Sequence, residues 1–236
     1  MYINPKLVVF DCDGVLVDSE LLVHQLAAEH LSLLGCSLSL EESLQKFTGK
    51  NAQAIRDLIF QETGIEVSEE FWKDSQRKIL EAFSTDLSSL IPEVLEHLKK
   101  HSVARCVASS SHRTRVCHAL QATHQLSYFQ EEHIFTSQQV KHGKPAPDLF
   151  LFAAQKMQYL PQDCIVIEDS VSGIEAALAA NMPVIGFLGG THAQYEWYHQ
   201  RLKAYDIPIA HNAQELLLLL NNELHSKKET YTPSCG

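Results

Sequence analysis

The chain has 236 residues, of which 45% are hydrophobic and 20% charged, and its formal net charge is -10. The hydrophobic share is that of a globular protein and excludes a largely disordered chain. The length allows one elaborated domain or a core with a smaller inserted unit. The negative charge, with no basic patch to offset it, argues against nucleic acid and anionic membranes as partners.

The six cysteines include no C-x-x-C pair, so we expect reduced thiols. The apolar run at residues 7–10 is too short for the core of a signal peptide. The longest leucine run, at residues 216–220, is far too short to span a bilayer. These features predict a cytoplasmic protein.

Short apolar runs alternate with helical patterns along most of the chain. The first run, at residues 7–10, is typical of a strand buried on both faces. Further strands are expected at residues 104–108, 134–135, 164–167 and 184–187, and helices at about 92–100, 113–121, 147–158 and 170–181. Strands that alternate with helices predict an α/β fold with a parallel sheet and right-handed crossovers.

Residues 19–90 interrupt this alternation, because they contain helical patterns and no convincing strand. Helices are expected at about 20–34, 40–47, 52–62 and 69–83, with breaks at Gly35, Gly49 and Gly64. We predict a core of residues 1–18 and 91–224, an all-helical cap of residues 19–90, and a disordered tail at 225–236. A cap inserted after the first strand lies over the carboxyl ends of the sheet, where open α/β folds bind ligands.

Asp11 and Asp13 directly follow the first predicted strand. Two carboxylates about 4 Å apart repel by about 4 kcal/mol at an effective dielectric of 20, and a divalent cation such as Mg²⁺ removes that cost. A calcium loop fails on spacing, because Val15, Leu16 and Leu22 stand where such a loop needs polar residues, glycine and glutamate. Solvated acids at a strand end are the other alternative.

Three later segments make solvated acids a poor explanation. The second strand ends in the hydroxyls of Ser109 and Ser110, which are able to bind an anion at the start of a helix. Lys144 precedes a proline that favours an extended backbone at the lysine. Glu168 and Asp169 end another strand. Each feature alone fits a helix cap or a surface turn, but the set is more specific than any member.

At these positions the sequence resembles the haloacid-dehalogenase-like hydrolase superfamily, in the subgroup with a helical cap. That subgroup includes β-phosphoglucomutase-like proteins and sugar-phosphate phosphatases. The resemblance rests on the stretch from Phe10 to Glu20, on Lys144 to Asp148, and on Glu168, Asp169 and Ser170 with Gly173, Ile174, Ala176 and Ala177. It implies a Rossmann-like core and a phosphatase.

The resemblance also implies roles for individual residues. Asp11 is expected to be the nucleophile that forms an aspartyl-phosphate, and Asp13 the general acid and then the general base. Ser109 and Lys144 are expected to hold the phosphoryl oxygens. Mg²⁺ is expected on the Asp11 carboxylate, the Asp13 carbonyl and the Asp169 carboxylate, with Glu168 holding a metal-bound water. An acid at position 13 argues against dehalogenation.

The predicted substrate is a small phosphorylated metabolite, such as a sugar phosphate, and the predicted state is a monomer. Two alternatives are a β-phosphoglucomutase-like mutase and a binding module controlled by phosphorylation. The mutases carry a histidine and an arginine in the cap where Val23 and Ala52 stand here, which argues against a mutase. A binding module of the response-regulator type has its acceptor aspartate after a middle strand, whereas Asp11 follows the first strand. Candidate substrate contacts are Ser110, His112, Arg113, Lys50, Asn51 and His24.

Overall fold

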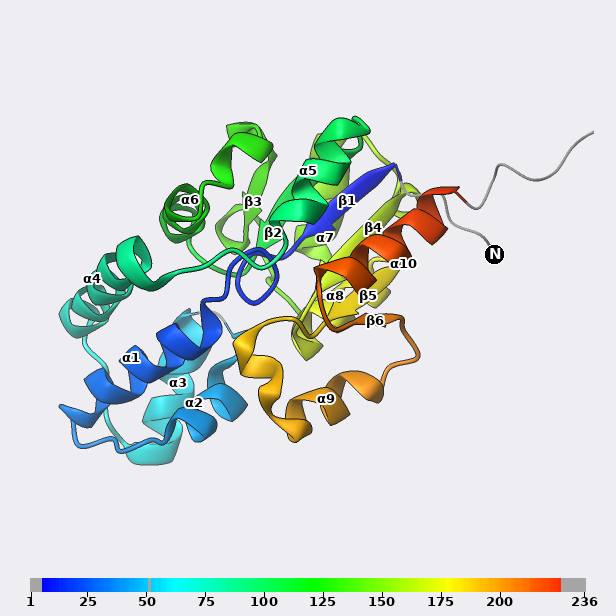
Figure 1. Ribbon diagram of the computed structural model, residues 1–236. Helices are drawn as coiled ribbons and strands as arrows, with labels where there is room; N and C mark the ends of the chain where they lie inside the picture. Colours follow the sequence, from blue (N-terminus) through cyan, green and yellow to red (C-terminus); the bar gives the residue numbers. More distant parts are fainter. Residues whose placement is uncertain (1–5, 51, 226–236) are drawn as a thin grey trace, which may run out of the picture.

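The protein is described from a computed structural model, which covers residues 6–50 and 52–225. In this part of the chain, one sheet has the order β3-β2-β1-β4-β5-β6, and all neighbouring strands are parallel (Figure 1). The strands are β1 (Leu7–Phe10), β2 (Ala104–Ser109), β3 (Ile134–Thr136), β4 (Cys164–Glu168), β5 (Val184–Phe187) and β6 (Ile209–Ala210). The predicted α/β class is confirmed.

β1 lies in the centre of the sheet and is buried on both faces. Because side chains alternate along a strand, Val8 and Phe10 enter one hydrophobic core while Leu7 and Val9 enter the other. The first core includes side chains of α5 (Pro92–Lys100), α6 (Arg113–Ala122) and α10 (Ala213–His225). The second includes side chains of α7 (Asp148–Met157), α8 (Val171–Ala179) and α9 (Glu196–Lys203).

The helices α1 (Glu20–Ser32), α2 (Leu40–Phe47), α3 (Ala52–Thr63) and α4 (Glu69–Asp86) follow β1, and we call them the cap. Figure 1 shows α1, α2 and α3 grouped at one end of the molecule, away from the sheet. They share a small apolar cluster of their own, which includes Leu31, Phe47 and Ile59. The three glycines predicted to break the helices, Gly35, Gly49 and Gly64, have positive φ angles of 81°, 75° and 72°.

The two connections between core and cap run side by side. Val17 forms an isolated bridge with Ser89, and the Leu90 amide donates to the Leu16 carbonyl over 3.0 Å. The chain therefore leaves and re-enters the core at one place, next to the end of β1. Division into domains at residues 18 and 90 stays a prediction that this arrangement supports.

The last part of the core contains elements that the sequence patterns did not predict, namely β6, α9 and α10. β6 has only two residues, and α9 combines aromatic and charged side chains without a clear apolar stripe. Short 3-10 helices also occur at η1 (Leu126–Tyr128), η2 (Glu131–His133), η3 (Ser137–Gln139), η4 (Pro161–Asp163) and η5 (Thr191–Gln194).

α10 includes His225, the first residue of the predicted tail, and residues 226–236 lie outside the described part. No helix in residues 6–50 and 52–225 is long and apolar enough to cross a membrane.

Candidate active site

The carboxyl ends of β1, β2 and β4 bring the predicted residues to one edge of the sheet. Phe10 is in register with Val107 of β2 and with Ile167 of β4, and the Asp11 amide donates to the Ile167 carbonyl over 3.0 Å. A cavity at this edge, here called the catalytic cavity, separates the core from the cap. The predicted residues that line it are Asp11, Asp13, Ser109, Ser110, Lys144, Glu168, Asp169, Lys50 and His24.

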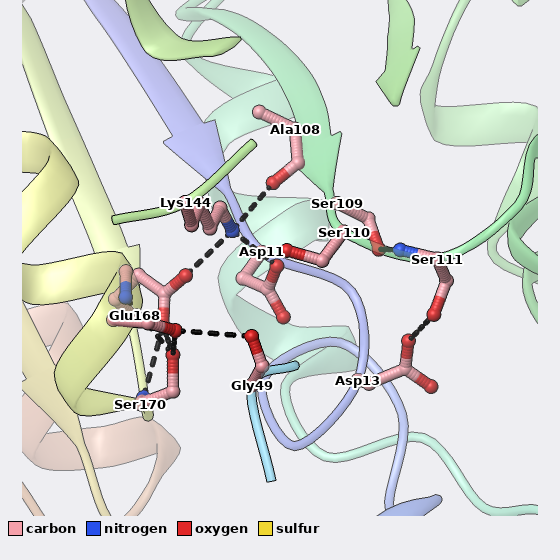
Figure 2. Close-up of polar contacts among 12 residues, drawn as sticks. Asp11, Asp13, Gly49, Ala108, Ser109, Ser110, Ser111, Lys144, Glu168 and Ser170 are labelled. Atoms are coloured by element: carbon pink, nitrogen blue, oxygen red, sulfur yellow. Dashed lines mark hydrogen bonds and ion pairs between the residues drawn. The ribbon is translucent and has the colours of Figure 1, made fainter. Parts of the chain in front are cut away.

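Lys144 connects two carboxylates of the cavity wall (Figure 2). Its Nζ atom donates to Asp11 Oδ1 and to Glu168 Oε1, each over 2.6 Å, and to the Ala108 carbonyl over 2.9 Å. An ammonium group has three N–H donors, so all three are used within the protein. Lys144 therefore fixes the Asp11 carboxylate directly, a role that the sequence analysis did not assign to it.

Burial and the neighbouring charges act in opposite directions on the pKa values of Asp11 and Lys144. Loss of solvent raises the pKa of Asp11 well above its usual value, and the Lys144 charge opposes that effect. Burial lowers the pKa of Lys144, but the Asp11 and Glu168 carboxylates raise it to a net value above the usual one. The lysine is therefore charged throughout the physiological range and compensates the buried acids.

Glu168 is fully buried, and both its oxygens have partners inside the protein. Oε1 accepts from Lys144, while Oε2 accepts from the Ser170 amide and hydroxyl, each over 2.9 Å. A Cβ atom added at Gly173 would overlap the Glu168 carboxylate, which accounts for a glycine in the first turn of α8. Glu168 thus anchors Lys144, and any contact with a metal-bound water would come in addition to these bonds.

Asp13 is held by three donors. Ser19 and Arg115 donate to its Oδ1 over 2.6 and 2.7 Å, and Ser111 donates to its Oδ2 over 2.7 Å. Arg115 is a residue that the sequence analysis missed, and its guanidinium also lies 5.4 Å from the ring centre of Phe83 on α4. Arg115 therefore links Asp13, the residue expected to act first as general acid and then as general base, to helix α4 of the cap.

Asp169 has an imidazole and a phenol beside it. His192 Nε2 lies 2.9 Å from its Oδ2, at ion-pair distance but without hydrogen-bond geometry, and the Tyr198 hydroxyl donates to the same oxygen over 3.3 Å. Burial raises the pKa of Asp169, and despite opposition from His192 the value is about 6. A Cβ atom at Gly14 would overlap this carboxylate, so the loop after Asp13 passes directly beside Asp169.

The cap contributes a buried polar network to the wall of the catalytic cavity. His24 bonds through Nε2 to Glu20 at 3.1 Å and to Thr48 at 3.2 Å, and through Nδ1 to Ser43 at 2.9 Å. Burial raises the pKa of Glu20, but the His24 hydrogen bond and charge bring it down to about 2. His24 therefore lies at the cavity with its ring nitrogens already engaged.

The other residues predicted to contact the substrate do not all lie at the catalytic cavity. Lys50 lines the catalytic cavity, and within the described residues its ammonium group has no hydrogen-bond or ion-pair partner. His112 lines a neighbouring cavity and caps α6. Arg113 points away, since its guanidinium donates to the carbonyls of Ile134 and Glu131 over 2.5 and 2.6 Å. Asn51 lies outside the described residues.

A family model described as haloacid dehalogenase-like hydrolase matches residues 8–187, which is most of the chain. The chain belongs to this family. The predicted resemblance and the predicted class of enzyme, a hydrolase, are thereby confirmed. Membership of an enzyme family also disfavours the binding-module alternative.

Several relatives of this hydrolase are named as phosphatases. It is 28% identical to 6-phosphogluconate phosphatase of Escherichia coli, an alignment that covers 79% of this chain and 84% of the relative. It is 30% identical to hexitol phosphatase A of the same organism, with 75% and 80% covered. A solved hydrolase of the family from Deinococcus radiodurans, with bound phosphate and sodium, is 30% identical at a TM-score of 0.72, with 94% and 97% covered.

The charges of the hydrolase's catalytic cavity suit a divalent cation. Its wall carries five carboxylates and three permanent cations, namely Asp11, Asp13, Glu20, Glu168 and Asp169 against Lys50, Arg115 and Lys144. This excess of negative charge opposes the binding of a phosphate dianion unless a cation enters with it. Oxygen ligands of this kind are those that Mg²⁺ prefers.

No three His, Cys, Asp or Glu side chains in the described ranges are grouped as a complete metal site. The set that the family resemblance implies requires only two carboxylates, Asp11 and Asp169, together with the backbone carbonyl of Asp13. Both carboxylates line the catalytic cavity, and the close approach of the Gly14 backbone to Asp169 puts the Asp13–Gly14 turn beside it. The residues present therefore fit the cation.

Three contacts in the hydrolase were not found by sequence reasoning. Ser111 directly precedes His112, the N-cap residue of α6, and Arg115 is in the first turn of that helix, so their approach to Asp13 depends on how the chain enters the helix. Glu20 and His24 are four residues apart on α1, the spacing at which side chains share a helix face, so this pair left a local signal. His192 left none, because it reaches Asp169 from the short 3-10 helix η5, which follows β5.

Proposed function

We propose that the protein is a magnesium-dependent phosphatase that hydrolyses a phosphorylated metabolite through an aspartyl-phosphate on Asp11. The observation that carries the proposal is the buried Asp11–Lys144–Glu168 triad beside a second carboxylate, Asp13, that three donors hold in place. A fixed nucleophile and a fixed proton carrier on one cavity are what a two-step displacement at phosphorus requires.

In the first step, a carboxylate oxygen of Asp11 forms a bond to phosphorus, and the bond from phosphorus to the alcohol oxygen breaks. Asp13 gives its proton to that oxygen, so a neutral alcohol leaves. Lys144 holds Oδ1 of the nucleophile during this displacement, while Ser109, at the end of β2, borders the same cavity. The step transfers the phosphoryl group from the ester to the Asp11 carboxylate as an acyl phosphate, and no water is consumed.

In the second step, Asp13 takes a proton from a water molecule as the water oxygen attacks phosphorus. The bond between phosphorus and Asp11 breaks, phosphate leaves, and the Asp11 carboxylate and the Asp13 proton are restored. Mg²⁺, bound by Asp11, Asp169 and the Asp13 carbonyl, would supply positive charge to the transferring group. Burial of Asp11 keeps bulk water from competing with the positioned molecule.

The phosphatase relatives support hydrolysis over transfer between positions of one sugar. Where the mutases carry a histidine and an arginine, Val23 and Ala52 line the cavities with apolar side chains. Phosphorylated sugar acids and sugar alcohols, the substrates in the names of the Escherichia coli relatives, are the starting class for this chain. We also propose the cytoplasm as its compartment, since the described cysteines are all free.

The purified protein with Mg²⁺ should release inorganic phosphate from members of a panel of phosphate monoesters. The test follows both phosphate and positional isomers of each sugar phosphate. Release of phosphate without isomer supports the proposal. An isomer formed in the presence of a bisphosphate primer, with no phosphate release, would instead establish a mutase.

Removal of Mg²⁺ should reduce turnover to background, because the excess negative charge of the cavity then opposes the binding of the phosphate ester.

Asp169→Asn should raise the Mg²⁺ concentration needed for half-maximal activity by at least about tenfold. Thermal unfolding supplies a second readout, since a cation that binds only the folded state raises Tm with concentration. Asp163→Asn is the matched control, because Asp163 pairs with Lys6 away from the cavity.

Replacement of Arg115 by methionine should lower kcat by about 10²-fold, the lower end of the contribution of a positioned acid or base. KM should change much less, and Arg115→Lys should restore part of the loss because it can still donate to Asp13. Arg113→Met is the control, since Arg113 is on the same helix but points to the β3 side. Equal losses in both methionine variants would contradict the positioning role.

A further inference from the structure

A second, larger cavity of about 570 Å³ adjoins the catalytic cavity. It lies between the cap helices and the start of α6, and we call it the cap chamber. The two cavities share wall residues, among them Phe47, Ile55 and Arg115. A molecule whose phosphate reaches Asp11 can therefore extend its alcohol part into the chamber.

The chamber walls are mainly apolar. They include two aromatic side chains of α4, Phe71 and Trp72, with aliphatic side chains from α1 and α4 such as Leu31, Ile79 and Leu80. Three charged side chains of α4, Glu69, Lys73 and Arg77, also line the chamber, and each has an ion-pair partner. Arg77 pairs with Asp74 and Glu81, and Glu69 pairs with Lys73 and Arg56. They leave the apolar walls available to a ligand.

These walls are a poor match for a bare polyol. Each hydroxyl that enters an apolar cavity without a hydrogen-bond partner loses its bonds to water and gains none in return. His24, one of the polar groups on the wall, is already bonded to Glu20, Ser43 and Thr48. An aromatic ring suits the chamber, because it buries a large apolar area and stacks on aromatic side chains.

We propose that the substrate is a phosphate monoester whose alcohol carries an aromatic ring, and that the ring occupies the cap chamber. The inference rests on the proposed phosphatase function and narrows its substrate class. A sugar between the phosphate and the ring remains compatible with it, because the sugar would occupy the junction of the two cavities, where Lys50 and Ser110 stand.

The test compares two esters with the same type of primary leaving oxygen, propyl phosphate and 3-phenylpropyl phosphate, in the presence of Mg²⁺. The ring should lower KM by about 10- to 100-fold, a range set by the burial of one phenyl group less the cost of its immobilisation. Because both leaving groups are primary alcohols, a difference in chemical reactivity does not contribute to the difference in KM. Equal KM values for the two esters would overturn the proposal.

Calorimetric titration of Asp11→Asn with both esters measures the same preference without turnover. If no ester is hydrolysed but the phenylpropyl ester binds more tightly, the chamber proposal stands and the phosphatase proposal fails. If both esters are hydrolysed and bind equally, the chamber proposal alone fails. The two ideas are thereby separated.

Trp72→Leu keeps an apolar side chain on α4 but removes the ring, and it should move the ratio of the two KM values at least severalfold toward one. Phe60→Ala is the control, because Phe60 is an exposed aromatic residue of the cap that does not line the chamber. A ratio that changes equally in both variants would contradict the assignment. The wild-type ratio decides the matter if Trp72→Leu fails to fold.

Discussion

Asp11→Asn is expected to lower turnover by about 10⁴- to 10⁶-fold, the range seen when a nucleophile is removed. The asparagine has the same shape and can still accept from Lys144 Nζ, but it cannot form a stable bond to phosphorus. The fold should survive, because burial already disfavours the charged form of Asp11. Phosphate release and thermal unfolding of the variant measure the two effects separately.

Asp18→Asn is the matched control for that variant. Asp18 lies on the same loop, but its carboxylate accepts from the Thr191 amide and hydroxyl over 3.0 and 2.9 Å. An asparagine oxygen can accept both bonds, so activity should stay within a fewfold of wild type. Substantial activity in Asp11→Asn, or equal losses in both variants, would show that Asp11 is not the nucleophile.

Lys144→Met is expected to have the second large effect, on both stability and activity. The side chain of Lys144 is 2% exposed and bridges two carboxylates, so its loss leaves buried negative charge without a partner. Removal of one member of a buried ion pair costs about 3–5 kcal/mol in the free energy of unfolding. Turnover should fall by about 10³-fold or more, because the nucleophile loses the donor that fixes Oδ1.

A second substitution separates the two effects of Lys144→Met. Glu168→Gln, added to that variant, removes one uncompensated carboxylate and should recover part of the lost stability without recovery of activity. Lys156→Met is the surface control, since Lys156 packs over Phe152 outside the catalytic cavity. Denaturant unfolding and phosphate release give the two quantities. Recovery of activity in the double variant would contradict the role assigned to Lys144.

The central sheet and the main site were predictable because their signals are local. A strand such as β1 is a short run of apolar residues, and the acid that follows it must emerge at the strand's carboxyl end. In a parallel sheet these ends meet at one edge, so Asp11, Ser109 and Glu168 come together without any knowledge of helix packing. Lys144 was found through its motif and proline context.

The partners of these residues depend on packing that a single sequence does not display. Lys144 donates to Asp11 and Glu168 at the same time because the ends of β1 and β4 lie close together. Only the folded sheet defines that distance. His192 reaches Asp169 from a separate element, the 3-10 helix η5, without a fixed sequence spacing between the two residues. The cap chamber arises where α4 faces the start of α6, and its volume depends on how the cap lies on the core.

Direct capture of the covalent intermediate tests the central claim most closely. The protein with Mg²⁺ is mixed with a substrate from the panel, quenched in acid within one turnover, digested and analysed by mass spectrometry. We predict one phosphoryl group on the peptide that contains Asp11, absent from Asp11→Asn and present in Asp18→Asn. A phosphoryl group on a histidine or another residue, or turnover with an initial burst of alcohol and an unmodified Asp11 peptide, would contradict the mechanism.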